Sequence, residues 1–484
     1  MIEIGSSSPL RKAREFQEIF DNQRYSHLLD WHRERDEAGN YIPIRKRAPH
    51  IRYNLAKAIC QEMAGFLMGH RPFPTFQASE YDLADSLDWL RTYYLLKQIP
   101  TACLDACVQG SCGISFGWVR GKLLMRTWRR SEATPIFDDS GELLALVALF
   151  DGEHPKTGKS VQWRMTLDAM EETWEFRERS IVGNEDWSLH ETIKHEMGFV
   201  PAVWVRHLVE AIGRPDGISL LESLPELLKE IDYSYSRRGR SLDYSADPQA
   251  IIRDQDPEDF MKRLMKSPAG TWFFGEKGDA KYLEISGEGI KLQGEFASDL
   301  RRRAQEISRV FLPDPERLTG QHMSGFALRV LYGPQIALAD QLKVNWTTSL
   351  LELVAKILES AVIQRSKNRD VYMDGLEGLD GVPRPDASNT EDVEMRHPLL
   401  REVRRWPRPY YVMERWGLSA SWGPYFDTSP EEEESIMRTA AAGRSAGIIS
   451  QDTAIRMTAP HTGVGNIDEE LSRIQHDSGF EVLI

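Results

Sequence analysis

The sequence predicts a multi-part α+β protein, on three observations. The chain has 484 residues, enough for two to four domain-sized units with a substantial core. Hydrophobic residues make up 41% of the chain and aromatic residues 10%, which excludes a disordered protein. Stretches with helical apolar periodicity flank a middle third of short alternating segments separated by turns. We therefore expect helices on both sides of a β-rich region.

The charge and the ends of the sequence narrow the class of protein. The formal net charge is −14, from 74 acidic and 60 basic residues, which argues against a protein that wraps DNA or RNA. There is no apolar run of membrane-spanning length, and the first residues do not resemble a secretory signal. Four cysteines fit reduced cytosolic thiols better than a disulfide framework. We expect a soluble, acidic protein.

The N-terminal third is predicted to be helical. Arg11–Arg52 is dense in charge, and we expect a solvated arm or a helical lead-in there. A helix is expected over Ile51–Met68, because its apolar residues share one face. A second helix is expected over Ser79–Val108, broken near Pro100.

The middle of the chain is predicted to be a β-rich unit. Turn signals such as Asp139-Ser140-Gly141 and Thr157-Gly158-Lys159 separate short runs that alternate between apolar and polar residues. The expected strands are Ile114–Val119, Leu123–Trp128, Leu143–Phe150, Val161–Leu167 and Glu172–Arg177.

A helix, a compact insert and a returning helix follow. The first helix is expected to begin at Gly217 and to end by Pro248, and the second to cover Gly294–Phe311. Between them we expect strands at 250–253, 271–274 and 281–285 and a short helix at 257–266. The longest helix is expected to start after an N-cap at Ser324 and to kink at Gly333-Pro334.

The C-terminal part is predicted to end in helices. Residues 366–398 are rich in Gly, Pro and Asp and are expected to form a loop, followed by strands over Arg408–Glu414 and Leu418–Trp422. Residues 428–484 have a helical pattern with ten acidic and four basic residues. The run Glu431–Glu434 is expected to be the first turn of a helix that begins at Pro430, where acidic side chains are favourable.

One segment comes near a phosphate-binding loop. Gly152 and Gly158 are followed by Lys159 and Ser160, but five residues separate the glycines, whereas a Walker A loop has four. The residues after Ser160 alternate like a strand, so no helix N-terminus would face a phosphate. We expect a hairpin turn here.

No catalytic or metal-binding constellation is predicted. Cys103, Cys107 and Cys112 are spaced unlike the CxxC pairs of zinc sites, and buried thiols are the simpler interpretation. The sequence has no HExxH, GxSxG or GxGxxG pattern. The three arginines at 301–303 would point in three directions on a helix, so they form no shared phosphate-binding face. We therefore expect a protein that is not an enzyme and has no cofactor or metal.

The order of the expected elements resembles the portal proteins of tailed double-stranded-DNA bacteriophages, of the siphophage type. A β-rich unit, a helix, a small α/β insert, a returning helix, a short loop and a long kinked helix occur in that family in the same order. Short matches support the resemblance and span roughly Asn54 to Gln475. They are Asn54–Pro72, Gly110–Val119 with Arg129–Asp138, His195–Val203, Ser324–Leu328, Gly447–Thr453 and Asp468–Ile474.

The resemblance implies a division of the chain into the parts of a portal subunit: a β-rich wing, a two-helix stem, a small α/β clip, a long kinked wing helix and a helical C-terminal crown. These parts are the N-terminal arm (1–50), the wing (51–215), a stem helix (216–248), the clip (249–290), a second stem helix (291–310), the tunnel loop (311–323), the long helix with the rest of the wing (324–427) and the crown region (428–484). The tunnel loop contains Pro313 and Pro315, whose rings restrict the backbone, so we expect a stiff loop. In this respect the sequence departs from the family, in which a mobile loop is expected.

The resemblance also implies a function and a set of partners. The protein would form a ring, by family a dodecamer, at one vertex of the virion capsid after assembly in the host cytoplasm. Double-stranded DNA would pass through its channel during packaging and ejection. The terminase large subunit would supply the ATPase, and the major capsid, scaffolding and head-completion adaptor proteins would bind around the ring. No membrane is involved.

The resemblance places candidate site residues in three regions. We expect the tunnel loop to face DNA through Asp314, Glu316, Arg317, Gln321 and His322. We expect the stem to face the lumen through Lys229, Asp232 and Arg240, with Leu224, Leu228, Ile231 and Tyr235 turned toward neighbouring subunits. We expect the clip to contact the motor or a connector through Asp254, Glu258, Lys262 and Lys266.

Two other classes stay open on the sequence. One is an enzyme of the same packaging machinery, a nuclease or an ATPase, which would need clustered carboxylates or a true phosphate loop. The other is a different ring protein of a capsid or baseplate. The net charge of −14 opposes tight gripping of phosphates, but it is compatible with a conduit that surrounds DNA without holding it.

Overall fold

The computed structural model describes most of the chain and resolves it into two compact units. The larger unit comprises residues 1–312 and 337–423, and the smaller unit comprises residues 313–336 and 424–484. The described ranges are 9–178, 186–209, 216–246, 249–253, 279–283, 287–313, 325–367, 379, 382–383, 392–396, 403–409, 412–426, 430–462 and 470–474. No helix within these ranges is long and apolar enough to cross a membrane.

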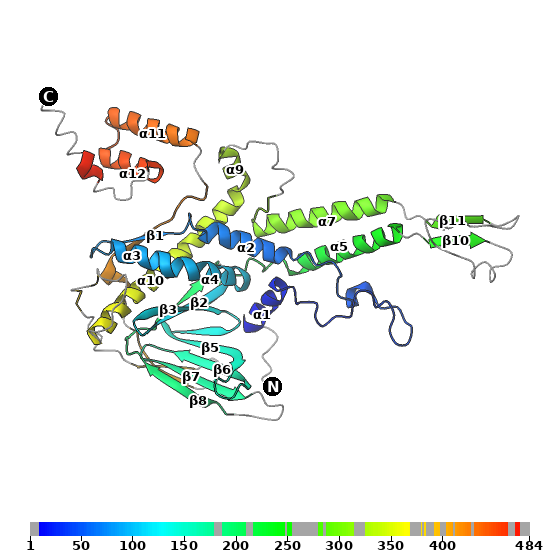
Figure 1. The fold of residues 1–484 in the computed structure, drawn as a ribbon, viewed down its shortest axis with the longest axis horizontal. Helices are drawn as coiled ribbons and strands as arrows, with labels where there is room; N and C mark the ends of the chain where they lie inside the picture. Colours follow the sequence, from blue (N-terminus) through cyan, green and yellow to red (C-terminus); the bar gives the residue numbers. More distant parts are fainter. Residues whose placement is uncertain are drawn as a thin grey trace. The chain divides into compact units, whose positions relative to one another are not determined.

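The β-rich part of the larger unit consists of two antiparallel sheets. The first has the order β4-β5-β6-β7-β8 and the second the order β3-β2-β9 (Figure 1). The strand bounds are β2 Ser111–Val119, β3 Lys122–Arg129, β4 Ala133–Phe137, β5 Leu143–Glu153, β6 Ser160–Leu167, β7 Glu171–Glu178, β8 Ser188–Lys194 and β9 Ala202–Arg206. All five strands expected in this region are confirmed, and β4, β8 and β9 are additional.

Strand β5 is buried on both faces. Leu146 and Ala148 belong to a core cluster that also contains Trp128 and Trp204. Ala145 and Val147 belong to a second cluster, on which Trp406 packs. Near the start of β5 the pairing with β4 shifts register, and a bulge of this kind reverses which face a side chain occupies.

The expected hairpin turn after β5 is confirmed. The N–H of Gly158 donates to the carbonyl of His154 (2.8 Å), and Gly158 adopts φ +66°, a conformation that favours glycine. The N–H of His154 donates to the carbonyl of Lys159 (2.9 Å), which closes the turn between β5 and β6. No helix follows the turn, so this segment does not form a phosphate loop.

The N-terminal part of the larger unit is helical, and its last helix packs on β2 and β3 of the second sheet. The helices are α1 Pro9–Phe20, α2 Leu55–Met68, α3 Ala84–Leu90 and α4 Leu96–Gln109, with the π-helical turn η2 Arg91–Leu95 between the last two. The expected break near Pro100 is wrong: Pro100 lies inside α4, and the irregularity is η2 just before it. Proline removes one N–H, and here the helix continues through that loss.

Helix α5 spans Pro225–Ala246 and therefore begins eight residues later than expected. Gly217 instead lies against the start of β2, where its N–H donates to Ser111 Oγ (2.8 Å). A Cβ on Gly110 would lie 2.5 Å from the carbonyl oxygen of Gly217, so only glycine allows this approach. The segment before Pro225 is thus held in a bridge at Ile218 and in turns over 219–224, and proline then opens the helix.

The insert and the returning helix are present. Strands β10 Gln249–Arg253 and β11 Asp279–Leu283 pair antiparallel, which confirms the outer strands expected there. The expected helix 257–266 and strand 271–274 lie outside the described residues. Helix α7 spans Gly287–Ser308 and begins seven residues earlier than expected.

The long helix is interrupted where the sequence indicates. Helix α9 covers Gly325–Leu331 and α10 covers Gly333–Lys367, with Tyr332 between them, so the disruption expected at Gly333-Pro334 is confirmed. The N-cap expected at Ser324 lies outside the described residues. In the larger unit α10 is a core helix: Trp346, Leu350 and Ile357 are fully buried.

The strands expected after the long helix are partly wrong. Strand β12 Asp392–Arg396 lies in the segment expected to be loop and pairs with β13 Val403–Pro407, which ends before the strand expected over Arg408–Glu414. The described residues of that range form no strand, and its last two belong to η4 Met413–Trp416. Pro407 and Pro409 flank the end of β13 and cannot donate to a ladder, so the strand falls earlier. Strand β14 Leu418–Ser421 is confirmed and pairs with β1 Thr75–Ala78.

The smaller unit contains the C-terminal helices. Helix α11 spans Pro430–Ser445, which confirms the start expected at Pro430, and α12 spans Gln451–Thr462. Ser450 caps α12, because its hydroxyl accepts from the N–H of Thr453 (3.1 Å). The rings of Tyr332 and Phe426 meet edge to face at 5.3 Å within the same unit.

Candidate functional site: the paired helices and the arm segment

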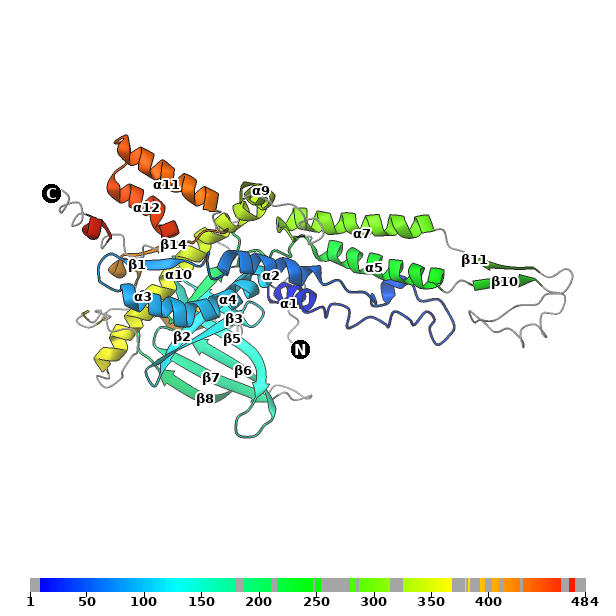
Figure 2. The ribbon, with the colours of Figure 1, turned by 45° about the horizontal axis from the view of Figure 1, so that its top comes forward.

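Helices α5 and α7 form a pair that lies side by side in both views (Figures 1 and 2). Each has 22 residues, so each is about 33 Å long. Small residues of α7 face α5: Gly294, Ala297 and Ala304 are buried, and a Cβ on Gly294 would lie 2.9 Å from the guanidinium of Arg238. Close approach of the two helices therefore depends on small side chains.

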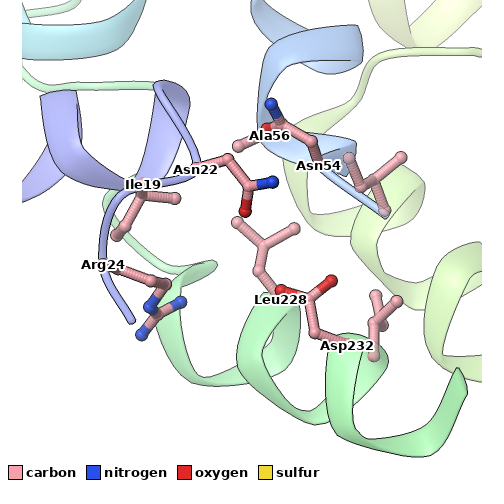
Figure 3. A pocket seen from close by; sticks show the side chains of 9 residues that line it. Ile19, Asn22, Arg24, Asn54, Ala56, Leu228 and Asp232 are labelled. Carbon is pink, nitrogen blue, oxygen red and sulfur yellow. The ribbon is translucent and has the colours of Figure 1, made fainter. Parts of the chain in front are cut away.

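The first half of α5 is covered by residues 21–54, which we call the arm segment. Asp232 lies at the centre of this contact and is buried. Its two carboxylate oxygens accept hydrogen bonds from the hydroxyl of Tyr25 and the N–H of Tyr53, each at 2.8 Å. Figure 3 shows Asp232 and Leu228 of α5 pointing toward Asn54 and Asn22. One α5 carboxylate thus fixes both ends of the arm segment.

Burial determines the titration of this pair. Burial raises the pKa of Asp232, and the hydrogen bonds from Tyr53 and Tyr25 oppose that rise only in part. The pKa of the Tyr25 hydroxyl is raised as well, first by burial and then by the charge of Asp232. At neutral pH Tyr25 therefore stays a hydrogen-bond donor to the carboxylate.

A second contact holds the middle of the arm segment. The hydroxyl of Tyr233 donates to the carbonyl of Arg47 (2.8 Å). Arg47 is itself buried, donates to the carbonyl of Trp31 (2.8 Å) and lies over the Trp31 ring at 5.5 Å. The ring of Tyr25 meets that of Tyr233 edge to face at 6.2 Å. Tyr25, Trp31 and Tyr233 form, with Ala48, a small core between the arm segment and α5.

Ion pairs continue this contact along the surface. They join Lys12 to Glu222, Arg45 to Glu230 and Arg240 to Glu34. Each pair connects the N-terminal residues to α5 or to the segment just before it. The expectation of a solvated arm is therefore wrong for residues 21–54, because aromatic side chains and ion pairs dock them on α5.

The predicted stem residues have separate environments. Lys229 is partly exposed and lies 3.9 Å from Glu226, and Arg240 is ion-paired with Glu34. Asp232 differs from its expected place on a polar face turned to a lumen, since the arm segment buries it. Only Lys229 and Arg240 keep partial access to solvent.

The apolar face expected to meet neighbouring subunits also needs correction. Leu224, Leu228 and Ile231 are buried within this chain. Leu228 and Ile231 line a small internal cavity with Ile19 of α1 and with Leu55 of α2 (Figure 3). Tyr235 stacks on Tyr53 of the arm segment, with ring centroids 5.5 Å apart. The sequence shows the apolar face but not that its own N-terminal residues cover it.

The other predicted site residues lie outside the described residues. This holds for the tunnel-loop residues Asp314, Glu316, Arg317, Gln321 and His322 and for the clip residues Asp254, Glu258, Lys262 and Lys266. Their roles stay predictions.

A further set of exposed apolar side chains on α7 was not singled out from the sequence. Leu292, Phe296 and Ile307 are 60%, 51% and 51% exposed. Their positions place them on one side of α7, away from the buried Gly294, Ala297 and Ala304. The spacing of four between Leu292 and Phe296 is the signal that could have identified this side.

One buried cluster has the residue types of a metal site. Ligand atoms of Cys103, Cys107 and His207 lie within 4.8 Å of one another. The indole N–H of Trp346 donates to Nδ1 of His207 (3.3 Å), so the neutral ring carries its proton on Nε2, which faces Cys107 Sγ at 3.4 Å. Burial raises the pKa of the Cys107 thiol. Coordination of a metal ion through Nε2 would require the other tautomer, in which Nδ1 carries the proton and no longer accepts from Trp346.

Comparisons with known proteins gave matches only among solved structures. No family model and no curated protein matches the sequence. A chain of a structure described as the virion of a native gene transfer agent (GTA) particle matches with TM-score 0.41 and 11% identity over 84% of this chain and 89% of that chain. A chain from the neck of an empty GTA particle, computed with C6 symmetry, matches with TM-score 0.43 and 12% identity over 83% and 89%.

A chain from the neck of a native GTA particle, computed with C12 symmetry, matches with TM-score 0.41 and 10% identity over 83% of this chain and 89% of that chain.

Proposed function

We propose that this chain is a portal protein, which forms a ring at one vertex of a phage-like capsid and encloses a channel for double-stranded DNA. The observation that carries the proposal is that α5 leads into the paired strands β10 and β11, after which α7 returns alongside α5. This arrangement corresponds to the stem and clip implied by the sequence resemblance, and the interrupted pair α9 and α10 follows it in the expected order. The role is structural rather than enzymatic.

The α5–α7 pair supports an assembled ring. The arm segment and α7 cover much of α5, whereas α7 still exposes Leu292, Phe296 and Ile307. Aligned large apolar side chains of this kind are typical of a contact surface. In a ring each subunit contacts its two neighbours through two different surfaces, and the uncovered side of the helix pair supplies one of them. We assign this surface of α7 to the contact between subunits.

The remaining parts of the proposal follow from this assignment. Of the predicted stem residues Arg240 would meet the DNA, since Lys229 lies beside α1 and the arm segment. The tunnel loop would line the channel, and the clip would bind the terminase motor or an adaptor. A channel lined by few basic side chains would let DNA slide through, because many contacts with the phosphates would hold the DNA in place. A packaging nuclease or ATPase is the alternative, and no described cluster of residues favours it.

The substitution Phe296→Glu tests the ring contact. A charge buried in an apolar contact costs on the order of 2 kcal/mol per subunit contact, so we expect the variant to shift from a ring toward monomers in native mass spectrometry. Lys291→Glu, on an exposed position of the same helix, is the control and should assemble like the original chain. Both variants should keep the same circular dichroism spectrum. A Phe296→Glu variant that still forms the ring would refute the assigned contact.

A further inference from the structure

A cleft of about 560 Å³ lies between α1, residues 24–28 of the arm segment, and the first two turns of α5. Clefts of roughly 300–1,000 Å³ are the size of sites for small ligands or short segments of chain. Its basic side chains come from three separate parts of the sequence: Arg11 and Arg14 on α1, Arg24 and Arg45 on the arm segment, and Lys229 on α5.

The charge of the cleft is opposite to the charge of the chain. Five Arg and Lys side chains and His27 line it, against three glutamates, Glu15, Glu18 and Glu226. The chain as a whole has a net charge of −14. A locally positive cleft on an acidic chain attracts an anionic partner.

The walls of the cleft are held in place by contacts already formed. Arg24 donates to the carbonyl of Pro225 (2.8 Å), and Arg45 is paired with Glu230 of α5. Lys12, on the same helix as Arg14, is paired with Glu222. The cleft therefore exists before a ligand binds, which lowers the entropy lost on binding.

The lining also has an apolar part. Ile19 and Tyr25 are buried at its base, and Leu28 lines it beside them. A polyphosphate backbone has no apolar side chain that could pack against this part of the lining. A peptide that combines carboxylates with one apolar side chain satisfies both parts of the lining.

We propose that this cleft docks a short acidic peptide segment of a partner protein. The glutamates of the cleft restrict the orientation of the peptide by repelling its carboxylates, and the five basic side chains supply the attraction. This proposal does not depend on the portal assignment, since it concerns a surface formed by α1, the arm segment and α5 of a single chain.

Fluorescence anisotropy with a labelled decapeptide of glutamates around a central leucine tests the proposal on the full chain. We expect binding that weakens as salt rises, and a loss of about tenfold or more in affinity for the double variant Arg14→Glu, Lys229→Glu. Lys46→Glu is the matched control: it is an exposed basic residue next to Arg45 that does not line the cleft, and it should bind like the original chain.

Three outcomes would overturn the proposal. The decapeptide fails to bind the original chain, the double variant binds as tightly as the Lys46→Glu control, or a short duplex DNA of equal charge binds at the cleft while the peptide does not. An unchanged circular dichroism spectrum for both variants separates loss of binding from loss of folding. Each outcome is independent of whether the chain forms a ring.

Discussion

Replacing Arg415 by alanine is expected to destabilise the larger unit by about 3 kcal/mol, because it removes a cation from a buried ionic contact. Glu359 of α10 is almost fully buried and accepts from Arg415 Nη1 (2.6 Å) and from the indole N–H of Trp416 (3.0 Å). Without Arg415 the carboxylate keeps a buried charge with fewer partners. Urea unfolding followed by tryptophan fluorescence measures the effect.

Arg405→Ala is the matched control for this experiment. Arg405 is also paired with a glutamate, Glu394 at 3.0 Å, but both side chains are largely exposed. Exposed pairs contribute about 0–1 kcal/mol, so the control should unfold near the midpoint of the original chain. If Arg415→Ala and Arg405→Ala have the same midpoint, the buried contact does not hold α10 to the segment around η4.

Replacing Asp232 by alanine is expected to release the arm segment from α5. The substitution leaves the Tyr25 hydroxyl and the Tyr53 N–H without their acceptor in a buried contact, a loss of about 2–3 kcal/mol. Limited trypsin digestion measures the release, since Arg24, Arg33 and Arg35 lie in the arm segment. Asp243→Ala, an exposed position on the same helix, is the control, and equal cleavage of the two variants would contradict the contact.

The pH dependence of cleavage in the arm segment distinguishes the effect of the Asp232 charge from the effect of its hydrogen bonds. Because the folded pKa is raised, the folded chain binds the proton more readily than the unfolded chain between the ordinary carboxyl pKa and the folded one. In that window the docked arm loses stability as pH rises. Asp232→Asn has no titration. Its Oδ1 still accepts from the N–H of Tyr53 and its amide N–H donates to the Tyr25 hydroxyl oxygen, so its cleavage rate should not follow this trend.

Local patterns in the sequence predicted local structure well. Alternation predicted the strands β2, β3, β5, β6 and β7, the Thr157-Gly158-Lys159 signal predicted the turn after β5, and Gly333-Pro334 predicted the interruption of the long helix. Each of these features depends on residues within a few positions of one another. Pro430 opened α11 as expected for the same reason.

Contacts between distant segments could not be predicted. Tyr25 and Asp232 are separated by 207 positions, and nothing near either residue indicates the other. For the same reason the apolar face of α5 was assigned to neighbouring subunits, although the chain's own N-terminal residues cover it. The late start of α5 depends on the close approach of Gly110 and Gly217, which are also distant in sequence.

The amino-acid composition also gave no indication of the basic cleft, because its basic residues come from separate segments of the sequence. A net charge of −14 describes the average surface, whereas the cleft gathers five basic side chains from three segments. The average still agrees with a ring that encloses DNA without binding it tightly.

Negative-stain electron microscopy of the purified chain tests the central proposal most directly. The portal assignment predicts top views of a closed ring around a central hole, with the α5–α7 pairs arranged around the axis. Particles that remain single subunits at every concentration, or that form open chains without a hole, would contradict it.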